Sequence, residues 1–296
     1  QITVFQRTAN YAAPANNGPV REEHLQKLQA DRDTYHEEAR WSRAGVPLPR
    51  SEEPFFTVEP EERQRRLEKG FARGDLLTIN TLFTDLVSNQ AANDSVAEFF
   101  RDKVRAKVTD PQTAEDLCAK DFPLFTKRLC LETNYFETFN LPHSKLINLR
   151  HTPIESITET GIDTTEESME FDSIVFATGF DAMTGAIVAV DIRGRHGIEL
   201  KDVWEEGPKT YLGLNVHGFP NFFTITGPGS PSVLSNMVVS IEQHVDWITA
   251  AFEHLRNQGL KTLEATAAAQ EGWATHVNDF ANLTLYPVAN SWYMGA

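Results

Sequence analysis

The chain has 296 residues, 41% hydrophobic and 23% charged, as in an average soluble globular protein with one large domain or two ordinary ones. Its 42 acidic and 27 basic residues give a net charge of −15 at pH 7, which argues against a nucleic-acid-binding protein because a polyanion would be repelled. No apolar run approaches the roughly 20 residues that span a bilayer, and the chain shows no signal-peptide pattern. We therefore expect no membrane span and a cytoplasmic location.

The two cysteines, Cys118 and Cys130, belong to no CxxC motif, and the histidines are scattered along the sequence. This pattern argues against a structural zinc site and against a secreted disulfide framework. We expect two reduced thiols and no metal site.

The first third of the chain is predicted to be a short strand followed by helices. Ile2–Arg7 is rich in β-branched and aromatic residues, which indicates a buried strand. Ala12–Val20 has the proline, asparagine and glycine content of a loop. Helical spacing and capping patterns then predict an almost wholly helical block over about residues 20–120. It is made of Arg21–Gly45, Glu61–Ala72, Asp75–Ser88, a helix that begins where Asp94 precedes the capping-box pattern Ser95-Val96-Ala97-Glu98, and a helix that begins at Asp110-Pro111.

The rest of the chain combines strands with one long helix. An amphipathic helix is predicted over about Val233–Gln258, where apolar residues recur every three or four positions. Strands that alternate with helices indicate an α/β fold with a helical insertion. The predicted strands are Lys145–Leu149, Ile154–Thr160, Asp172–Ala177, Tyr211–Asn215 and Phe222–Thr226.

Arg7 and Thr8 end the first predicted strand. In a doubly wound dinucleotide fold, the second strand ends beside the adenine ribose, where an arginine accommodates the 2′-phosphate of NADP. Guanidinium and hydroxyl groups suit a phosphate, because the arginine fork donates two parallel hydrogen bonds. The alternative interpretation is an arginine solvated at the protein surface.

Lys127 and Arg128 are two adjacent cations in the segment Thr126-Lys127-Arg128, which follows Pro123-Leu124-Phe125. Two neighbouring positive charges can serve one anionic site. From these residues alone, the interpretation that both lie in water stays open.

Two glycine-containing turns are further candidates. Asp172–Phe180 is an apolar run that ends in Ala177-Thr178-Gly179, where glycine allows the backbone to approach a ligand closely. Many flavoproteins with two dinucleotide sites have such a strand where the chain passes from the NADP domain to the FAD domain. Gly227 and Gly229 lie between a predicted strand and the long helix, so free N–H groups and the helix dipole would favour a negative charge there. A purely structural turn is the alternative.

Other motifs of known chemistry are absent from the sequence. It contains no GxGxxG or GxxxxGK[ST] phosphate loop, no GxSxG nucleophile turn and no HExxH zinc motif. The residues therefore favour neither a hydrolase nor a metalloenzyme.

Taken together, these segments resemble the type I Baeyer–Villiger monooxygenases, in particular the phenylacetone, steroid and cyclohexanone monooxygenase group. The resemblance runs in family order along essentially the whole chain. It is carried by Val4–Thr8, Thr126–Leu129, Asn134–Glu137, Phe176–Asp181, Tyr211–Leu214, Phe219–Phe223, Gly227–Met237, Ser240–Val245 and Ser291–Tyr293.

The resemblance implies a two-dinucleotide-binding flavoprotein with Rossmann-like FAD and NADP domains and a helical insertion. Residues 1–13 and 123–179 would be part of the NADP domain, 14–122 the inserted helical subdomain, and 180–296 the C-terminal half of the FAD domain. The implied activity uses FAD, NADPH and O₂ to insert oxygen beside a ketone carbonyl, through a C4a-peroxyflavin and a Criegee intermediate. The implied partners are a small-molecule ketone and O₂, and the sequence does not give the oligomeric state.

Site roles follow from the resemblance at matching positions. Arg7, Thr8 and Lys127 would hold the 2′-phosphate of NADPH, and Arg128 would be the catalytic arginine beside the flavin. Further cofactor-binding positions would be Thr178, Gly179, Gly227, Gly229, Met237 and Trp292, the last on a loop that closes over the nicotinamide. Ser232, Val233 and Leu234 would shape the substrate pocket.

The family's glycine-rich FAD and NADP loops and its FxGxxxHxxxWP fingerprint have no counterpart in this sequence. We therefore expect a fragment that lacks the N-terminal FAD half and the C-terminal end, and that binds FAD poorly and is inactive by itself. Two alternatives remain: a flavin monooxygenase that oxidises nitrogen or sulfur, and an inactive truncated product that acts only as an interaction module.

Overall fold

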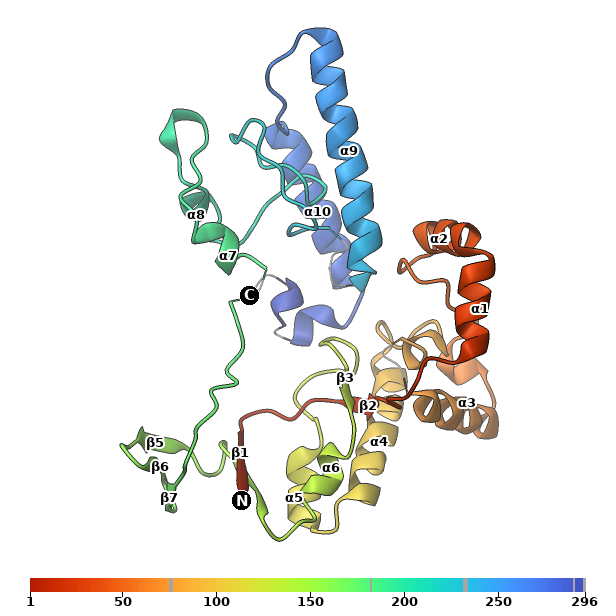
Figure 1. The fold of residues 1–296 in the computed structure, drawn as a ribbon, viewed down its shortest axis with the longest axis vertical. Coiled ribbons are helices and arrows are strands. Elements are labelled where there is room, and N and C mark those ends of the chain that lie inside the picture. The colour runs from red at the N-terminus through yellow and green to blue at the C-terminus, as the bar shows by residue number, and fades with distance from the viewer. Residues whose placement is uncertain (75–76, 182, 231–233, 290, 295–296) are drawn as a thin grey trace. The chain divides into compact units, whose positions relative to one another are not determined.

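The computed structural model describes residues 1–74, 77–181, 183–230, 234–289 and 291–294. The chain divides into two compact units, each of which combines two stretches of sequence (Figure 1). Unit 1 comprises residues 1–17 and 50–180, and unit 2 comprises residues 18–49 and 181–296. The helical segment 14–122 is therefore shared between the two units, because residues 18–49 group with the C-terminal part of the chain.

Unit 1 contains three small sheets and most of the helices of the first half of the chain. Its elements are β1 (Ile2–Gln6), β2 (Ala12–Pro14), α3 (Pro60–Arg73), α4 (Gln90–Lys107), α5 (Pro111–Leu117), β3 (Cys130–Glu132), α6 (Tyr135–Thr138), β4 (Ser144–Asn148), β5 (Ile154–Ile157), β6 (Gly161–Thr164) and β7 (Ser168–Glu170).

Two of these sheets are pairs of parallel strands, and each pair joins a strand from residues 2–14 to a strand from residues 130–148. β1 pairs with β4 in a register that runs from Ile2 opposite Ser144 to Gln6 opposite Asn148. β2 pairs with β3, with Ala12 opposite Cys130. β5, β6 and β7 form a separate antiparallel sheet. The predicted strands at Ile2–Arg7, Lys145–Leu149 and Ile154–Thr160 are thus confirmed.

Aromatic side chains form the core between the helices and β2. The ring of Phe100 on α4 lies 5.4 Å from that of Phe71 on α3 and 6.1 Å from that of Tyr11, both nearly perpendicular to it. Edge-to-face contacts of this kind stabilise aromatic pairs beyond the burial of their area. Tyr11 directly precedes β2, so this core fixes the parallel pair against α4.

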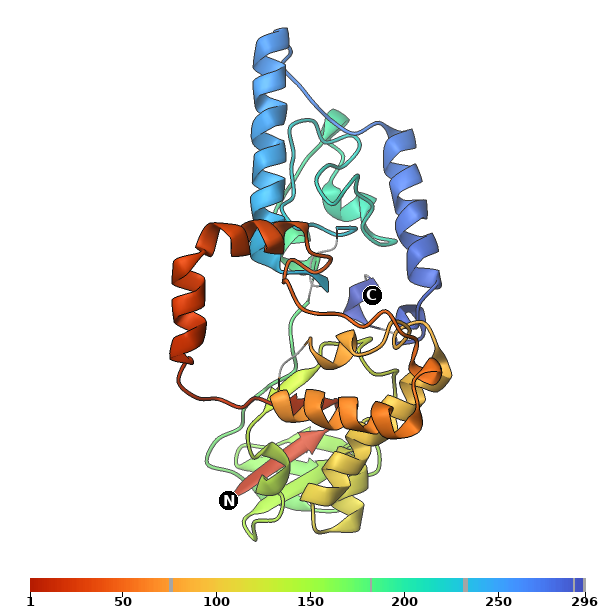
Figure 2. The same cartoon turned by 90° about the vertical axis from the view of Figure 1, so that its right-hand side faces the viewer.

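Unit 2 is mainly helical in the part of the chain that the structure describes. Its elements are α1 (Glu22–Ala30), α2 (Arg32–Trp41), α7 (Gly185–Val188), α8 (Leu200–Val203), α9 (Met237–Gln258) and α10 (Ala267–Asn282), with short 3₁₀ turns at Arg195–Gly197, Tyr286–Ala289 and Trp292–Met294. Leu200, Trp204, Val216 and Phe219 form a small buried cluster. Figure 2 shows α2 crossing the beginning of α9, to which it is ion-paired.

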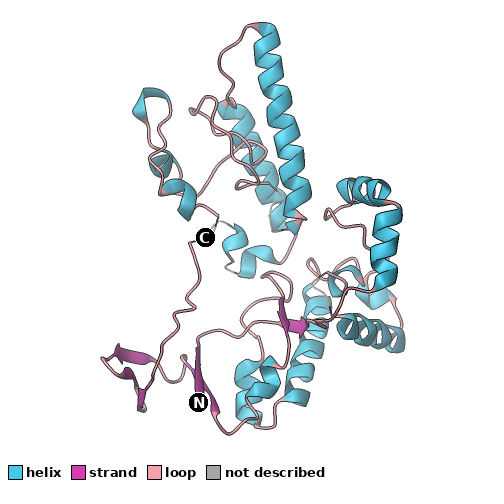
Figure 3. Ribbon diagram, viewed as in Figure 1, coloured by secondary structure: helices cyan, strands magenta, loops and turns pink. Residues whose placement is uncertain are grey.

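Three predicted strands are wrong. Asp172–Ala177 is an irregular connection that leaves β7, drawn as a loop in Figure 3. Within the described residues it has no strand partner, and Val175 is 86% exposed. Tyr211–Asn215 and Phe222–Thr226 form only isolated bridges. An extended apolar segment becomes a strand only when a neighbouring strand completes its hydrogen bonds.

Two details of the predicted helices are also wrong. Asp75–Ser88 forms turns and a 3₁₀ helix at Ile79–Thr81 rather than an α-helix, with residues 75–76 outside the described part. Asp94 lies inside α4, whose N-cap is Asn89, since the Asn89 side chain accepts a hydrogen bond from the Ala92 amide. The cap at Asp110 is confirmed by its hydrogen bond from Thr113, and α10 was not predicted.

The described helices include none that is both long and apolar enough to cross a bilayer. The same residues contain no group of three or more His, Cys, Asp or Glu side chains placed to hold a metal ion.

Candidate functional site

The predicted site residues lie in both units, and each unit is described separately. Unit 1 contains Arg7, Thr8, Lys127, Arg128, Thr178 and Gly179, and unit 2 contains Gly227, Gly229, Leu234, Met237 and Trp292. Ser232 and Val233 lie outside the described residues.

In unit 1, two basic segments run side by side although about 120 positions separate them in the sequence. Asn10 Nδ2 donates to the carbonyl of Arg128 at 3.2 Å, and the Cys130 amide donates to the carbonyl of Tyr11 at 3.0 Å. Both segments enter the parallel pair β2–β3 from the same end. The structure thus brings the chain that carries Arg7 and Thr8 next to the chain that carries Lys127 and Arg128.

The turn Asp121-Phe122 links these two segments further. Asp121 Oδ1 pairs with Arg150 at 2.6 Å, and Arg150 Nε donates to the carbonyl of Arg7 at 3.1 Å. The next residue, Phe122, presents its ring to Lys127, whose Nζ lies 4.6 Å from the ring centroid. Arg150 is a basic residue of this region that the sequence did not single out, because its place beside Arg7 depends on the pairing of β1 with β4.

The charges of Arg7 and Lys127 are not neutralised within the described chain. Neither side chain meets a carboxylate among the residues that the structure describes. Partly buried cations of unit 1 such as Arg66, Arg101 and Lys107 are paired with carboxylates, whereas the partly buried Lys127 and the exposed Arg7 are not. Two cations on adjacent segments, neither paired with a carboxylate, are a combination that suits a dianionic phosphate. The phosphate-binding role of Arg7, Thr8 and Lys127 stays a prediction.

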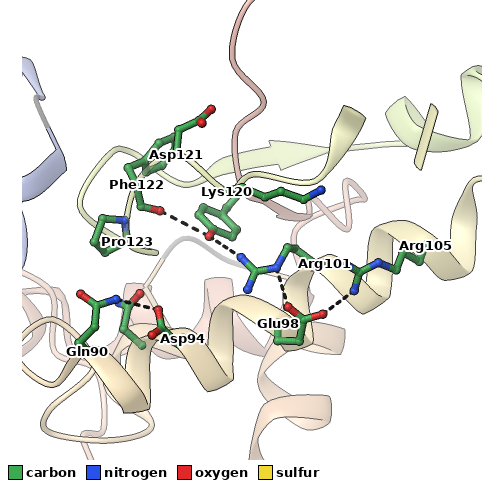
Figure 4. A pocket seen from close by; sticks show the side chains of 11 residues that line it. Gln90, Asp94, Glu98, Arg101, Arg105, Lys120, Asp121, Phe122 and Pro123 are labelled. Carbon is green, nitrogen blue, oxygen red and sulfur yellow. Dashed lines mark hydrogen bonds and ion pairs between the residues drawn. The ribbon is translucent and has the colours of Figure 1, made fainter. Parts of the chain in front are cut away.

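A groove of unit 1 contains charged side chains of both signs, several of them paired with one another (Figure 4). Its volume is about 460 Å³, and it lies along α4 beside the turn at residues 120–123. Arg101 pairs with Glu98 at 2.7 Å and donates to the Tyr11 hydroxyl at 3.1 Å, and Arg105 also binds Glu98. The two arginines lower the pKa of Glu98 by hydrogen bonding, Arg105 most strongly. The arginine charges are paired with Glu98, and Arg101 holds the Tyr11 hydroxyl. We therefore assign these side chains a role in the fold and not in phosphate binding.

Thr178 and Gly179 are exposed on the irregular connection that follows β7. Gly179 has φ +90°, and a Cβ built there would meet no other atom within 4 Å. The backbone conformation therefore favours glycine, as predicted for a turn, but no close backbone approach within the described chain requires it.

In unit 2, the Gly227–Ser230 turn is tightly packed. The Thr226 amide donates to Nδ1 of the buried His244 at 2.9 Å, and Trp273 Nε1 donates to the carbonyl of Gly229 at 2.9 Å. The long helix begins later than predicted, because α9 starts at Met237, with Asn236 as its cap. The cofactor-binding role predicted for Gly227 and Gly229 stays a prediction.

The remaining positions in unit 2 are partly exposed. Leu234 is 52% exposed, and Met237, the first residue of α9, is 42% exposed. Trp292 lies in a short 3₁₀ turn with its ring centroid 4.5 Å from that of Tyr293. The roles predicted for these residues stay predictions.

Comparison with known proteins identifies relatives along the whole chain, although no protein-family model matches it. A Baeyer–Villiger monooxygenase of Pseudooceanicola batsensis is 37% identical over 297 residues, and cyclohexanone 1,2-monooxygenase of Acinetobacter sp is 35% identical over 300 residues. Both alignments cover 100% of this chain and 54% of the relative. A phenazine N-monooxygenase of Lysobacter antibioticus is 35% identical over 99% of the chain.

A solved structure gives the same result for the fold. Oxidised steroid monooxygenase bound to NADP superposes with a TM-score of 0.94 and 42% identity, over 100% of this chain and 56% of that one. The chain is thus homologous throughout to part of the Baeyer–Villiger monooxygenases and has the predicted two-dinucleotide-binding flavoprotein fold. It spans about half the length of the curated relatives it matches.

Proposed function

We propose that these residues are part of an FAD- and NADPH-dependent Baeyer–Villiger monooxygenase, which converts a ketone, O₂, NADPH and a proton into an ester or lactone, NADP⁺ and water. In this proposal, residues 1–13 and 123–179 belong to the NADP domain, 14–122 to the inserted helical subdomain and 180–296 to the FAD domain. We also propose a cytoplasmic location, where the free thiols of Cys118 and Cys130 would stay reduced.

The observation that carries the proposal is the pair of cations Arg7 and Lys127, which meet no carboxylate in the described chain. Asn10 holds the two segments side by side through its hydrogen bond to the Arg128 carbonyl. This adjacency supports the proposal that both cations bind the same anionic ligand. A 2′-phosphate is the group that distinguishes NADPH from NADH, and an arginine at the end of this strand is how dinucleotide folds recognise it.

Arg128 supplies the charge for the oxygen-transfer step in this proposal. A guanidinium group carries a fixed positive charge, so it can stabilise negative charge that develops on substrate oxygen. The bound flavin would supply the activation of O₂. The Asn10 side chain holds the Arg128 backbone, which would orient the guanidinium.

On the other unit, Met237 and Trp292 would contact cofactor, and Ser232, Val233 and Leu234 would face the ketone. The partial exposure of Leu234 and Met237 supports this assignment, because apolar side chains at the start of a helix are available to line a pocket.

The test is oxygen transfer by the whole protein under ¹⁸O₂. One ¹⁸O atom in the ester product, with consumption of NADPH in preference to NADH, is the expected result. Ketone-independent NADPH oxidation without a labelled ester would contradict the proposal.

N-oxidation is the second candidate, supported by the similarity to a phenazine N-monooxygenase. The same labelling experiment with an aromatic N-heterocycle separates the two, since the label would then appear in an N-oxide and not in an ester. A protein that binds neither FAD nor NADPH would instead favour an interaction module.

A further inference from the structure

The N-cap of α9 is held by a turn that is almost 200 positions away in the sequence. The Asn236 amide donates to the carbonyl of Ala44 at 2.7 Å, and Asn236 Nδ2 donates to the carbonyl of Gly45 at 3.1 Å. The Asn236 side chain also caps the helix, because its Oδ1 accepts from the Val238 amide at 3.1 Å. One side chain therefore joins the start of α9 to the turn that follows α2.

The contact leaves no room for a side chain at residue 45. Gly45 is buried and has φ +65°, and a Cβ there would lie 2.8 Å from Asn236 Cβ and 3.3 Å from Asn236 N. A real Cβ cannot come so close to another carbon, so any other residue would displace Asn236 or the turn.

A hydrogen-bond contact and an ion pair fix the register of α2 against α9. His36 Nε2 lies 3.0 Å from Glu242 Oε2, and Arg40 lies 3.0 Å from Asp246. Each pair is one helical turn from the other on both helices, so α2 and α9 can shift along one another only by breaking both. Exposed pairs of this kind contribute little energy each, but they define one alignment.

The Gly227–Ser230 turn, which precedes the predicted substrate positions, is also held in place. The Thr226 amide donates a hydrogen bond to Nδ1 of the buried His244, and Thr210 Oγ1 donates to the carbonyl of Pro228 at 2.6 Å. The described residues on either side of the predicted substrate positions are thus held, Thr226 and Pro228 by the core of unit 2 and Asn236 by the turn after α2. The turn after α2 belongs to the helical segment 18–49, which carries none of the predicted site residues.

We propose that Gly45 and Asn236 form a specificity-determining contact, in which the turn after α2 sets the position of Leu234 and Met237 and thereby which ketones fit. This inference rests on the proposed function. Asn236 and Gly45 are positioning residues, because in this proposal it is Leu234 and Met237, and not Asn236 or Gly45, that contact the ketone.

The experiment compares three variants of the whole protein with FAD bound. Gly45→Ala introduces the clash with Asn236, and Asn236→Asp keeps a capping oxygen but removes the donor to Gly45. Gly259→Ala is the matched control, because Gly259 ends α9 with φ +63° and a Cβ there would meet nothing within 4 Å. All three are measured for kcat and KM with acetone, cyclohexanone and a steroid ketone.

For Gly45→Ala and Asn236→Asp, we expect the ratio of kcat/KM between large and small ketones to shift about tenfold in the same direction. The KM for NADPH should stay at the wild-type value. A smaller folded fraction would lower kcat for every ketone equally, so it would not change the ratio. Gly259→Ala should keep the wild-type ratio.

Hydrogen exchange gives an independent measurement of the contact itself. The first amides of α9 should exchange faster in Gly45→Ala and Asn236→Asp than in Gly259→Ala. A wild-type protein that oxidises ketones, together with variants whose ketone ratio is unchanged, would overturn this inference alone. A wild-type protein that oxidises no ketone would overturn the proposed function and this inference with it.

Discussion

The carbonyl of Arg7 accepts a hydrogen bond of 3.1 Å from Nε of Arg150, which joins the ends of two parallel strands that are 143 positions apart. Arg150 is in turn paired with Asp121 at 2.6 Å, so this carboxylate is already engaged. The Arg7 side chain itself meets no carboxylate among the described residues. This arrangement is the structural basis of the first two predictions.

Replacement of Arg7 should change coenzyme preference. Arg7→Ala in the whole protein is expected to raise the Kd for NADPH roughly 10- to 100-fold, the effect of one lost charge-assisted hydrogen-bonding group. The Kd for NADH should stay the same, because NADH has no 2′-phosphate. Titration with both coenzymes checks this, and an equal loss for both would show that Arg7 supports only the fold.

Replacement of Lys127 should also weaken binding of the 2′-phosphate, in addition to the loss expected for Arg7→Ala. Lys127→Ala is expected to weaken binding of 2′,5′-ADP but not of 5′-ADP, measured by calorimetry. Lys69→Ala is a control on an exposed helix position. If the two ADP isomers lose affinity equally, the phosphate assignment of Lys127 is wrong.

Arg128→Ala should separate coenzyme use from oxygen transfer. Loss of one preorganised charged donor typically lowers kcat about 10²- to 10³-fold. We expect that loss in ester formation, with the Kd for NADPH near the wild-type value. Arg128→Lys should recover part of the rate, since it keeps the charge but not the planar fork. Ester formation at the wild-type rate in Arg128→Ala would remove the arginine from the proposed catalysis.

His244 should make the folded state sensitive to acid. Burial lowers the pKa of His244, and its Nδ1 accepts from the Thr226 amide, which requires a neutral ring nitrogen. Because the unfolded chain binds the proton more readily, this part of the stability is present above the usual histidine pKa of about 6.5 and is lost as the pH falls below it.

The measurement is the Tm of the wild type and of His244→Asn at pH 7.5 and pH 5.5. Asparagine offers an oxygen to the Thr226 amide but does not titrate, so the decrease in Tm on acidification should be smaller in the variant. The same decrease in both proteins would assign the pH dependence to other groups.

Asn93 should be essential to the stability of unit 1. It is fully buried; its Nδ2 donates to the carbonyls of Leu86 and Leu124, and its Oδ1 accepts from the Leu124 amide. Asn93→Ala leaves these backbone groups buried without partners, and we expect a loss of about 3 kcal/mol in the free energy of unfolding. Urea denaturation measures it. Ser95→Ala, at an exposed position of the same helix, should change stability by less than about 0.5 kcal/mol.

Local signals in the sequence were sufficient for several elements. The β-branched run at Ile2–Gln6, the Asp110 cap and the apolar spacing along α9 each act through neighbours a few positions away. The family resemblance was also carried by the sequence, and the comparisons bear it out along the whole chain.

Only the tertiary structure decided which distant segments meet. The segment 172–177 has the composition of a strand, yet it remains irregular because no neighbouring strand among the described residues completes its hydrogen bonds. The proximity of Arg7 to Arg150 and of Gly45 to Asn236 likewise depends on contacts between residues more than 140 positions apart. Composition and periodicity describe one segment at a time, whereas these contacts depend on which segments pack together.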